Sequence, residues 1–279
     1  MADEKLPEAT GESPETRDQL TLFLSNVAEK CNLPTLPKVA ERAMQLTRRP
    51  DARTQEVTRV IRSDASLAAQ VFRISRSAAY LGRREPPRTL EEAITTVGFQ
   101  MVHRILLVAG VRSAYVMGDP VAERLWEHAL ATALAADELG QVAGQPRGGD
   151  GFIAGLLHDI GKLVFHLANA TAFASLPPFD RASEIRAFGV THAEVGRYLL
   201  NDWGLEPAVV RAVGNHHVHP IPAGLARTVV TADWIAYKIG FGSVREDIGA
   251  LETVDETVNL VAVADRVAYV FDRERELFD

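Results

Sequence analysis

The feature that most constrains this chain is the run from Gly155 to Lys162, GLLHDIGK, where an adjacent histidine and aspartate interrupt small and apolar residues. The apolar residues just before His158 predict a buried helix. Burying the ionised carboxylate of Asp159 beside them costs several kcal/mol unless a partner compensates its charge. A metal ion is one such partner, since imidazole and carboxylate suit iron, manganese or zinc. The alternative is a buried histidine that hydrogen-bonds to its neighbour's carboxylate.

Two further ligand-type residues lie in the middle of predicted helices. In the run 121–139, His128 follows Leu125 by three residues, so it shares an apolar helix face. Asp233 follows Val230 by three residues, which places a carboxylate in an apolar stripe with no cation on that face. Each of these polar side chains therefore needs a partner inside the core.

Three more histidines lie at the ends of predicted helices. Thr191 and Glu194 have the spacing of a capping box, which makes His192 the first residue of the helix that follows. A later helix, opened by a proline, closes with His216 and His217 on or beside its apolar stripe. Ligand-type residues thus recur on the buried faces of several helices.

Short motifs recur along most of the chain in a fixed order: LPTLP at 33–37, SDASLAAQV at 63–71, SAAY at 77–80, TLEEAI at 89–94, VG at 97–98, WEH at 126–128, GLLHDIGK at 155–162, THAEVG at 191–196, LL at 199–200, WGL at 203–205 and HH at 216–217. Through these motifs the sequence from Leu33 to about Phe241 resembles the HDOD domain of bacterial signalling proteins. That domain is a relative of the HD and HD-GYP metal-dependent phosphohydrolases.

The resemblance implies an all-α, two-lobed fold whose second lobe is an HD-type helical bundle. In the catalytic relatives an H…HD…D set holds one metal ion and additional histidines hold a second beside it. The implied cofactor is therefore a divalent metal, iron, manganese or zinc, in one or two equivalents. The residues that match the two ligand sets are His128, His158, Asp159 and Asp233 for the first ion, and His192, His216 and His217 for the second.

Asp159 and Lys162 are the predicted catalytic residues if the chain is an enzyme. Lys162 follows His158 by about one helical turn and would lie near enough to contact a phosphate oxygen, whereas the alternative is a surface lysine favoured by the helix dipole. HD-GYP phosphodiesterases follow the histidine pair with a glutamate and a Gly-Tyr-Pro segment. This chain instead reads HVHPIP from 217 to 222, so the resemblance covers the metal site but not the cyclic-dinucleotide pocket.

Two functions from different classes fit these observations. The first is a cytoplasmic regulatory module in bacterial signal transduction, which binds a signalling protein or a small phosphate-containing ligand. The alternative is a metal-dependent phosphohydrolase or phosphodiesterase that acts on a cyclic dinucleotide or another nucleotide phosphate. An open metal position with basic groups nearby favours the enzyme, whereas apolar closure by the loop 220–224 or by the other lobe favours the module.

Composition excludes several other classes of protein. A net charge of −7 disfavours binding to nucleic acid or to anionic membranes. The longest apolar runs, such as 105–111, are far shorter than the roughly 20 residues that span a bilayer, and no signal segment opens the chain, so we expect a cytoplasmic protein. The single cysteine, Cys31, excludes an internal disulfide.

The sequence predicts one HDOD domain after a polar tail. Residues 1–18 are acidic and small, with almost nothing apolar, and are predicted to be disordered. Residues 19–279 form the predicted domain, with an amino-terminal helical lobe at 19–117 and an HD-like lobe at 121–279. Met117 to Pro120 is the candidate hinge.

Apolar periodicity and capping residues predict helices throughout the domain, and no run alternates with the period of a strand. Predicted helix starts are Asp18, Pro37, Thr54, Asp64, Thr89 as a capping box with Glu92, and Phe99. A last helix over 258–276 is predicted to bury Leu260, Val261, Ala264, Val267, Ala268 and Phe271. Outside the proposed ligand sets, we interpret His103, His166 and His219 as structural or surface histidines.

Overall fold

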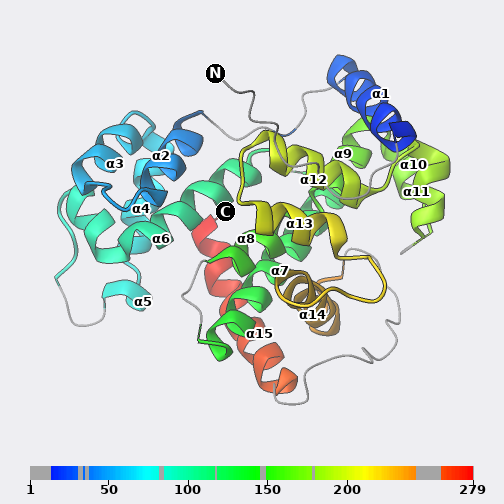
Figure 1. Ribbon diagram of the computed structural model, residues 1–279. Coiled ribbons are helices and arrows are strands. Elements are labelled where there is room, and N and C mark those ends of the chain that lie inside the picture. Colours follow the sequence, from blue (N-terminus) through cyan, green and yellow to red (C-terminus); the bar gives the residue numbers. More distant parts are fainter. Residues whose placement is uncertain are drawn as a thin grey trace, which may run out of the picture.

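A computed structural model describes residues 14–30, 34, 38–81, 85–116, 118–144, 149–177, 180–242 and 259–278. In these ranges every regular element is a helix, as predicted (Figure 1). The helices are α1 Pro14–Lys30, α2 Lys38–Arg48, α3 Thr54–Ile61, α4 Ala65–Ser75, α5 Ala78–Leu81, α6 Leu90–Arg112, α7 Pro120–Val142, α8 Asp150–Leu157, α9 Ile160–Ala168, α10 Ala170–Ala174, α11 Arg181–Phe188, α12 His192–Asp202, α13 Pro207–Asn215, α14 Leu225–Lys238 and α15 Leu260–Phe278. Cys31, most of the LPTLP motif and Met117 lie outside the described residues.

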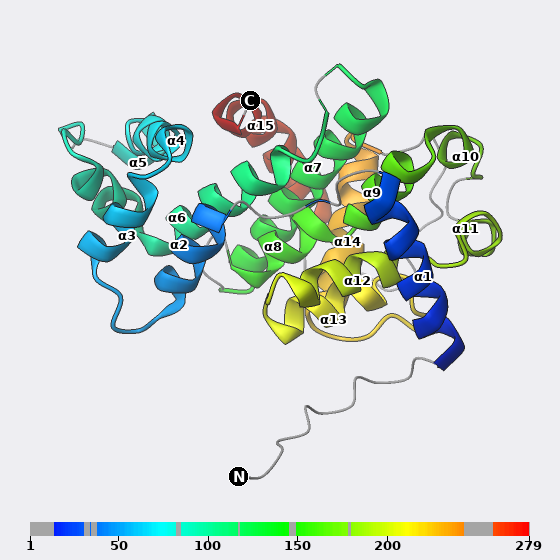
Figure 2. The ribbon, with the colours of Figure 1, turned by 90° about the horizontal axis from the view of Figure 1, so that it is seen from above.

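Helices α2 to α6 form one group and α7 to α14 form a second, larger group (Figures 1 and 2). Helix α7 lies at the centre of the larger group, where it packs against α8 and α14. Helix α6 joins the two groups and bends at Gly98, which adopts φ 79°. Only glycine adopts that backbone region readily. The two helices that the sequence predicted within residues 89–115 are therefore the two segments of α6, joined at this bend.

Helix starts follow the capping predictions in part. The carboxylate of Asp64 accepts hydrogen bonds from the backbone nitrogens at the start of α4, as predicted. Thr89 accepts from the backbone nitrogen of Glu92, but the Glu92 carboxylate returns to the backbone of Arg88, so the predicted capping box is only half formed. Helix α3 begins at Thr54, where the sequence predicted a helix start, but the predicted capping role was wrong, because Thr54 is already helical and the residue before it makes no side-chain cap.

Helix α1 packs against the second group of helices, away from α2 to α5 (Figures 1 and 2). The ring of Phe23 lies edge-on to Phe165 of α9, with 5.6 Å between ring centroids, and to Phe188 of α11, at 6.0 Å. These aromatic contacts place α1 outside the amino-terminal lobe to which the sequence assigned it. The helix also begins at Pro14, so the predicted tail ends before Asp18.

Helix α15 lies along α7 and also contacts α4 and α6, so it connects the two groups (Figure 2). Its buried stripe contains Val263, Val267 and Phe271, each spaced by one helical turn. Val261 and Ala268 are exposed, contrary to the prediction, because they lie on other faces of the same helix. Ion pairs of 2.8 Å with Glu138 and Glu127 of α7 hold the helix at two points.

Two stretches, Leu90–Arg112 and Asp150–Ala168, are long and apolar enough to cross a membrane by composition alone. However, 61% and 83% of their apolar windows are buried inside the molecule. Such burial is the pattern of core helices in a water-soluble protein.

Candidate metal centre

His158 and Asp159 lie at a break between two helices. Helix α8 is the buried helix predicted before His158; it ends at Leu157, and α9 begins at Ile160. Both side chains are buried, with exposed fractions of 1% and 5%. The break allows the two adjacent side chains to reach the same interior space, which consecutive residues in a regular helix do only at close range.

Side chains from four other segments converge on the same space. His128 projects from α7 and Asp233 from α14. His192 is the first residue of α12, fixed there by a capping box in which Thr191 and Glu194 cap each other as predicted. His216 and His217 follow the end of α13.

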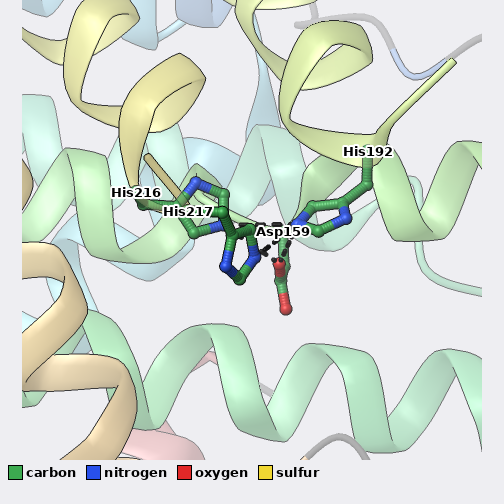
Figure 3. Close-up of side chains that lie close together, drawn as sticks. All are labelled: Asp159, His192, His216 and His217. Carbon is green, nitrogen blue, oxygen red and sulfur yellow. Dashed lines mark hydrogen bonds and ion pairs between the residues drawn. The ribbon is translucent and has the colours of Figure 1, made fainter. Parts of the chain in front are cut away.

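The converging side chains form two groups, in each of which the ligand atoms lie within 4.8 Å of one another. One group contains His128, His158 and Asp233, and the other contains Asp159, His192, His216 and His217. Figure 3 shows the second group, whose four side chains point toward one another. The structure therefore brings together all seven residues that the sequence singled out as metal ligands.

Asp159, a member of the second group, also faces the first group. Its Oδ2 atom is 3.4 Å from the Nε2 atoms of both His128 and His158. Its Oδ1 atom is 3.3 Å from Nε2 of His192 and 3.7 Å from Nε2 of His216. Each carboxylate oxygen therefore faces a different group of imidazoles, so Asp159 would help to hold a cation in either group.

Backbone carbonyls orient three of the imidazoles. The Nδ1 atoms of His128, His158 and His216 lie 2.6–2.8 Å from carbonyl oxygens, those of Phe241, Gly155 and Val213 respectively. A carbonyl oxygen only accepts, so each Nδ1 carries the proton and donates it. When such a ring is neutral, its Nε2 lone pair therefore points into the centre, as second-sphere hydrogen bonds arrange it in metal sites.

Several of the nitrogen and oxygen atoms that face the centre lack a hydrogen-bond donor from the protein. Nε2 of His128 is 3.3 Å from Nε2 of His158, and Nε2 of His192 is 3.0 Å from Nε2 of His217, so the nitrogens that would hold a cation face one another. Oδ1 of Asp159 is buried and has no hydrogen-bond partner. A divalent cation in each group would satisfy these atoms, and imidazole with carboxylate is a donor set suited to iron, manganese or zinc. The residues present therefore fit a pair of divalent cations.

Charges divide the centre into two electrostatic halves. Burial is the largest influence on His128 and opposes its protonation, but contacts with Asp159 and Asp233 outweigh burial and raise its pKa to about 9. Burial also opposes ionisation of Asp159, yet the charges of His158 and Lys162 hold the pKa of that carboxyl well below its usual range. The first group thus attracts positive charge.

The second group disfavours protons. Burial, with the positive charge of Lys162 adding to it, holds the pKa of His192 and of His217 below the usual histidine value. These imidazoles are therefore neutral at physiological pH, which is the state that coordinates metals.

Lys162 lies beside the centre and is mostly buried. Its side chain is 15% exposed, and its Nζ atom lies 2.6 Å from Oδ2 of Asp159. Burial opposes its charge, but Asp159 and Asp233 outweigh burial and raise its pKa above the usual lysine value. The alternative of a surface lysine was therefore wrong, while its predicted catalytic role stays a prediction.

The other histidines lie outside the centre. His166 pairs with Asp119, with 2.6 Å between Nε2 and Oδ2, and His103 lies 3.2 Å from the hydroxyl of Thr47. His219 is exposed beyond the end of α13. These contacts agree with the structural or surface interpretation of the three histidines.

Sequence reasoning missed one residue at the centre. Glu184 of α11 is buried, and its Oε1 atom lies 2.6 Å from Nδ1 of His192. Burial is the main reason that the pKa of Glu184 rises to about 7. No motif or apolar stripe marks this glutamate, because its role arises only from the packing of α11 beside α12.

Gly161 allows the close approach of α9 to α12. A Cβ atom at this position would overlap with the carbonyl oxygen of His192 and lie 2.8 Å from its carbonyl carbon and Cα. Only glycine therefore lets the His192 backbone approach the helix that follows Asp159.

Comparisons with known proteins agree with this architecture. The family model of the HDOD domain matches residues 33–219, so Asp233 lies beyond the matched region. An uncharacterized protein of Treponema pallidum (strain Nichols) is 25% identical over 217 residues, which are 74% of this chain, and the chain spans 42% of that relative's length.

Two crystal structures share the fold. An HDOD domain protein of unknown function from Geobacter sulfurreducens has a TM-score of 0.67 at 21% identity, over 94% of this chain and 96% of that one. A protein from Shewanella amazonensis SB2B, named as a phosphohydrolase candidate, also has a TM-score of 0.67, at 22% identity over 92% of this chain and 96% of that one. With two thirds of its length matched by the family model, this chain belongs to the HDOD domain family.

Proposed function

We propose that this HDOD protein is a regulatory signal-transduction module whose helical core binds two divalent cations. The observation that carries the proposal is the position of Asp159, whose two oxygens face two separate groups of inward-pointing imidazoles. Burying a carboxylate costs free energy of desolvation, and no hydrogen bond compensates this cost at Oδ1 of Asp159. A cation beside the carboxylate would offset it.

Cation binding would tie together five segments of the second helical group. The ligands come from α7, the α8–α9 junction, α12, the end of α13, and α14. Binding that links these segments stabilises the native arrangement relative to looser ones. The proposed output is recognition of a signalling protein, or of a small phosphate-containing ligand, by the arrangement that the cations stabilise.

The test is the metal content of a double variant. His158→Ala with Asp159→Ala removes one ligand of the first group and the carboxylate that faces both groups. We therefore expect at most about one tenth of the wild-type metal content by elemental analysis. His166→Ala is the control, since His166 is also buried but pairs with Asp119 outside the centre. Equal metal in the double variant and the control would contradict the proposal.

Hydrolysis of a phosphate ester is the second candidate function. Lys162 favours it, because an ammonium group held 2.6 Å from Asp159 adds a positive charge beside the proposed cations. Divalent cations supply, when bound, an activated nucleophile at neutral pH and stabilisation of phosphoryl charge. Two of the ligands are more exposed than the others: the side chain of Asp233 is 18% exposed, and His217 is half-buried. A substrate would therefore approach from their side.

Substrate screening on metal-loaded protein tests this second function. Manganese- or iron-loaded protein is expected to cleave a cyclic dinucleotide or a generic phosphodiester. Lys162→Met should lower kcat at least tenfold while metal content stays at the wild-type level. Intact substrates with fully loaded wild-type protein would exclude hydrolysis of these esters and leave the regulatory function standing.

A further inference from the structure

Glu184 contacts one metal ligand in two places. Its Oε1 atom lies 2.6 Å from Nδ1 of His192, and its Oε2 atom accepts a 2.9 Å hydrogen bond from the His192 backbone nitrogen. Its side chain is 10% exposed, and it lies on α11, whose buried residues are Ser183 and Glu184. One carboxylate therefore fixes both the backbone and the ring of His192.

This support differs from that of the other imidazoles. His128, His158 and His216 donate their Nδ1 protons to neutral backbone carbonyls. His192 faces a carboxylate instead. A carboxylate behind an imidazole fixes its tautomer and raises the basicity of the nitrogen that faces the metal.

Helix α11 makes a second contact with the same group of ligands. The guanidinium of Arg181 donates a 3.3 Å hydrogen bond to the backbone oxygen of His217. Nε2 of His217 is in turn 3.0 Å from Nε2 of His192. Two residues of α11 thus hold two ligands of the second group from outside.

We propose that Glu184 is a positioning residue for the cation of the second group, which consists of Asp159, His192, His216 and His217. Glu184 holds His192 with its proton on Nδ1 and its Nε2 lone pair directed at the ion. The inference rests on the proposed two-cation centre and deepens it, since it makes the two halves of the centre unequal. The first group contains the carboxylate of Asp233 and also faces that of Asp159, whereas the second group contains Asp159 alone and has Glu184 behind one of its imidazoles.

The variant Glu184→Gln separates shape from hydrogen-bond chemistry. A glutamine has one acceptor oxygen and one NH2 donor in place of two acceptor oxygens. If its oxygen accepts from the His192 backbone, its NH2 faces Nδ1 and forces the proton onto Nε2, where the cation should bind. If its oxygen faces Nδ1, its NH2 opposes the backbone N–H. Either orientation loses a contact that glutamate makes.

Titration of metal-free protein with manganese measures the consequence. We expect wild-type protein to bind two Mn²⁺ ions and Glu184→Gln to bind one of them about 10–100-fold more weakly. Electron paramagnetic resonance of a partly loaded variant should then show the spectrum of isolated Mn²⁺ in place of a coupled pair. Glu194→Gln is the matched control, since Glu194 caps the same helix through Thr191 without touching the His192 ring, and it should bind both ions as wild type does.

Nuclear magnetic resonance of the His192 ring gives a second readout that needs no variant. In metal-free wild-type protein the ring should carry its proton on Nδ1, and in zinc-loaded protein Nε2 should be bound to the metal. Wild-type affinity for both ions in Glu184→Gln, or a proton on Nε2 in metal-free wild type, would overturn the role of Glu184. If wild-type protein binds no metal at all, the proposed function fails, while the ring tautomer still decides whether Glu184 orients His192.

Discussion

Replacing Gly161 with alanine tests how closely α9 and α12 approach beside the centre. The new methyl group would overlap with the carbonyl oxygen of His192 and lie 2.8 Å from two further backbone atoms of that residue. All three nearest atoms belong to the backbone, so no side-chain rotation relieves the contact. The start of α12, and with it the His192 ring, must move.

The expected cost follows from two opposing effects. Overpacking a core position costs about 1–3 kcal/mol, and rigid backbone neighbours place this site at the upper end. Alanine recovers up to about 1 kcal/mol of helix propensity relative to glycine. The net loss is therefore about 2 kcal/mol, which for a domain of this size lowers the melting temperature by about 4–8 °C.

Thermal unfolding followed by circular dichroism measures the loss, with metal content measured on the same samples. Gly214→Ala is the matched control, since its methyl group would meet the flexible side chain of Arg197, at 2.7 Å from Cδ, rather than backbone. We expect the control to melt within about 2 °C of wild type. Equal melting temperatures for the two variants, with full metal in Gly161→Ala, would refute the reasoning.

Three further outcomes are expected from residues outside the ligand sets. Asp119→Ala should lower the free energy of unfolding by about 1–2 kcal/mol in urea, because Asp119 caps the start of α7. The hydrogen bond from His166 holds the pKa of Asp119 below its usual value of about 3.9, so the stability that this carboxylate contributes is present above that pH and is lost as the pH falls through the lower pKa of the folded protein. The free energies of unfolding of wild type and variant should therefore converge at low pH. A constant difference down to the acid limit would contradict the pairing of Asp119 with His166. Phe271→Ala should lower the free energy of unfolding by about 3–5 kcal/mol, since the buried ring packs on Phe241 with 3.8 Å between ring centroids. Tyr269→Ala, on the exposed face of α15, is the control and should change the free energy of unfolding by about 0.5 kcal/mol or less. Equal losses in the two variants would contradict the observed orientation of α15.

Local signals in the sequence were enough to place several residues of the centre. Thr191 and Glu194 define a helix start from four consecutive positions, so His192 could be assigned to the first turn without knowledge of the fold. His128 and Asp233 could be assigned inward from the apolar residues one turn away. Helical spacing determines which way such side chains face, but not which helices they face.

Contacts between distant segments could not be predicted in the same way. Glu184 lies on a helix without an apolar stripe, so its burial depends on where α11 packs rather than on its own neighbours in sequence. Helix α1 has an apolar face that fits either lobe, and the aromatic contacts of Phe23 decide its place. The helix break at His158 is likewise hidden, because the residues on both sides are apolar.

The most direct test of the two-cation centre is elemental analysis of protein purified without chelator. The position of Asp159 between two groups of imidazoles predicts about two equivalents of iron, manganese or zinc per chain. Metal that stays far below one equivalent, and that added iron, manganese or zinc does not restore, would contradict the centre. The converging histidines would then be a hydrogen-bonded polar core.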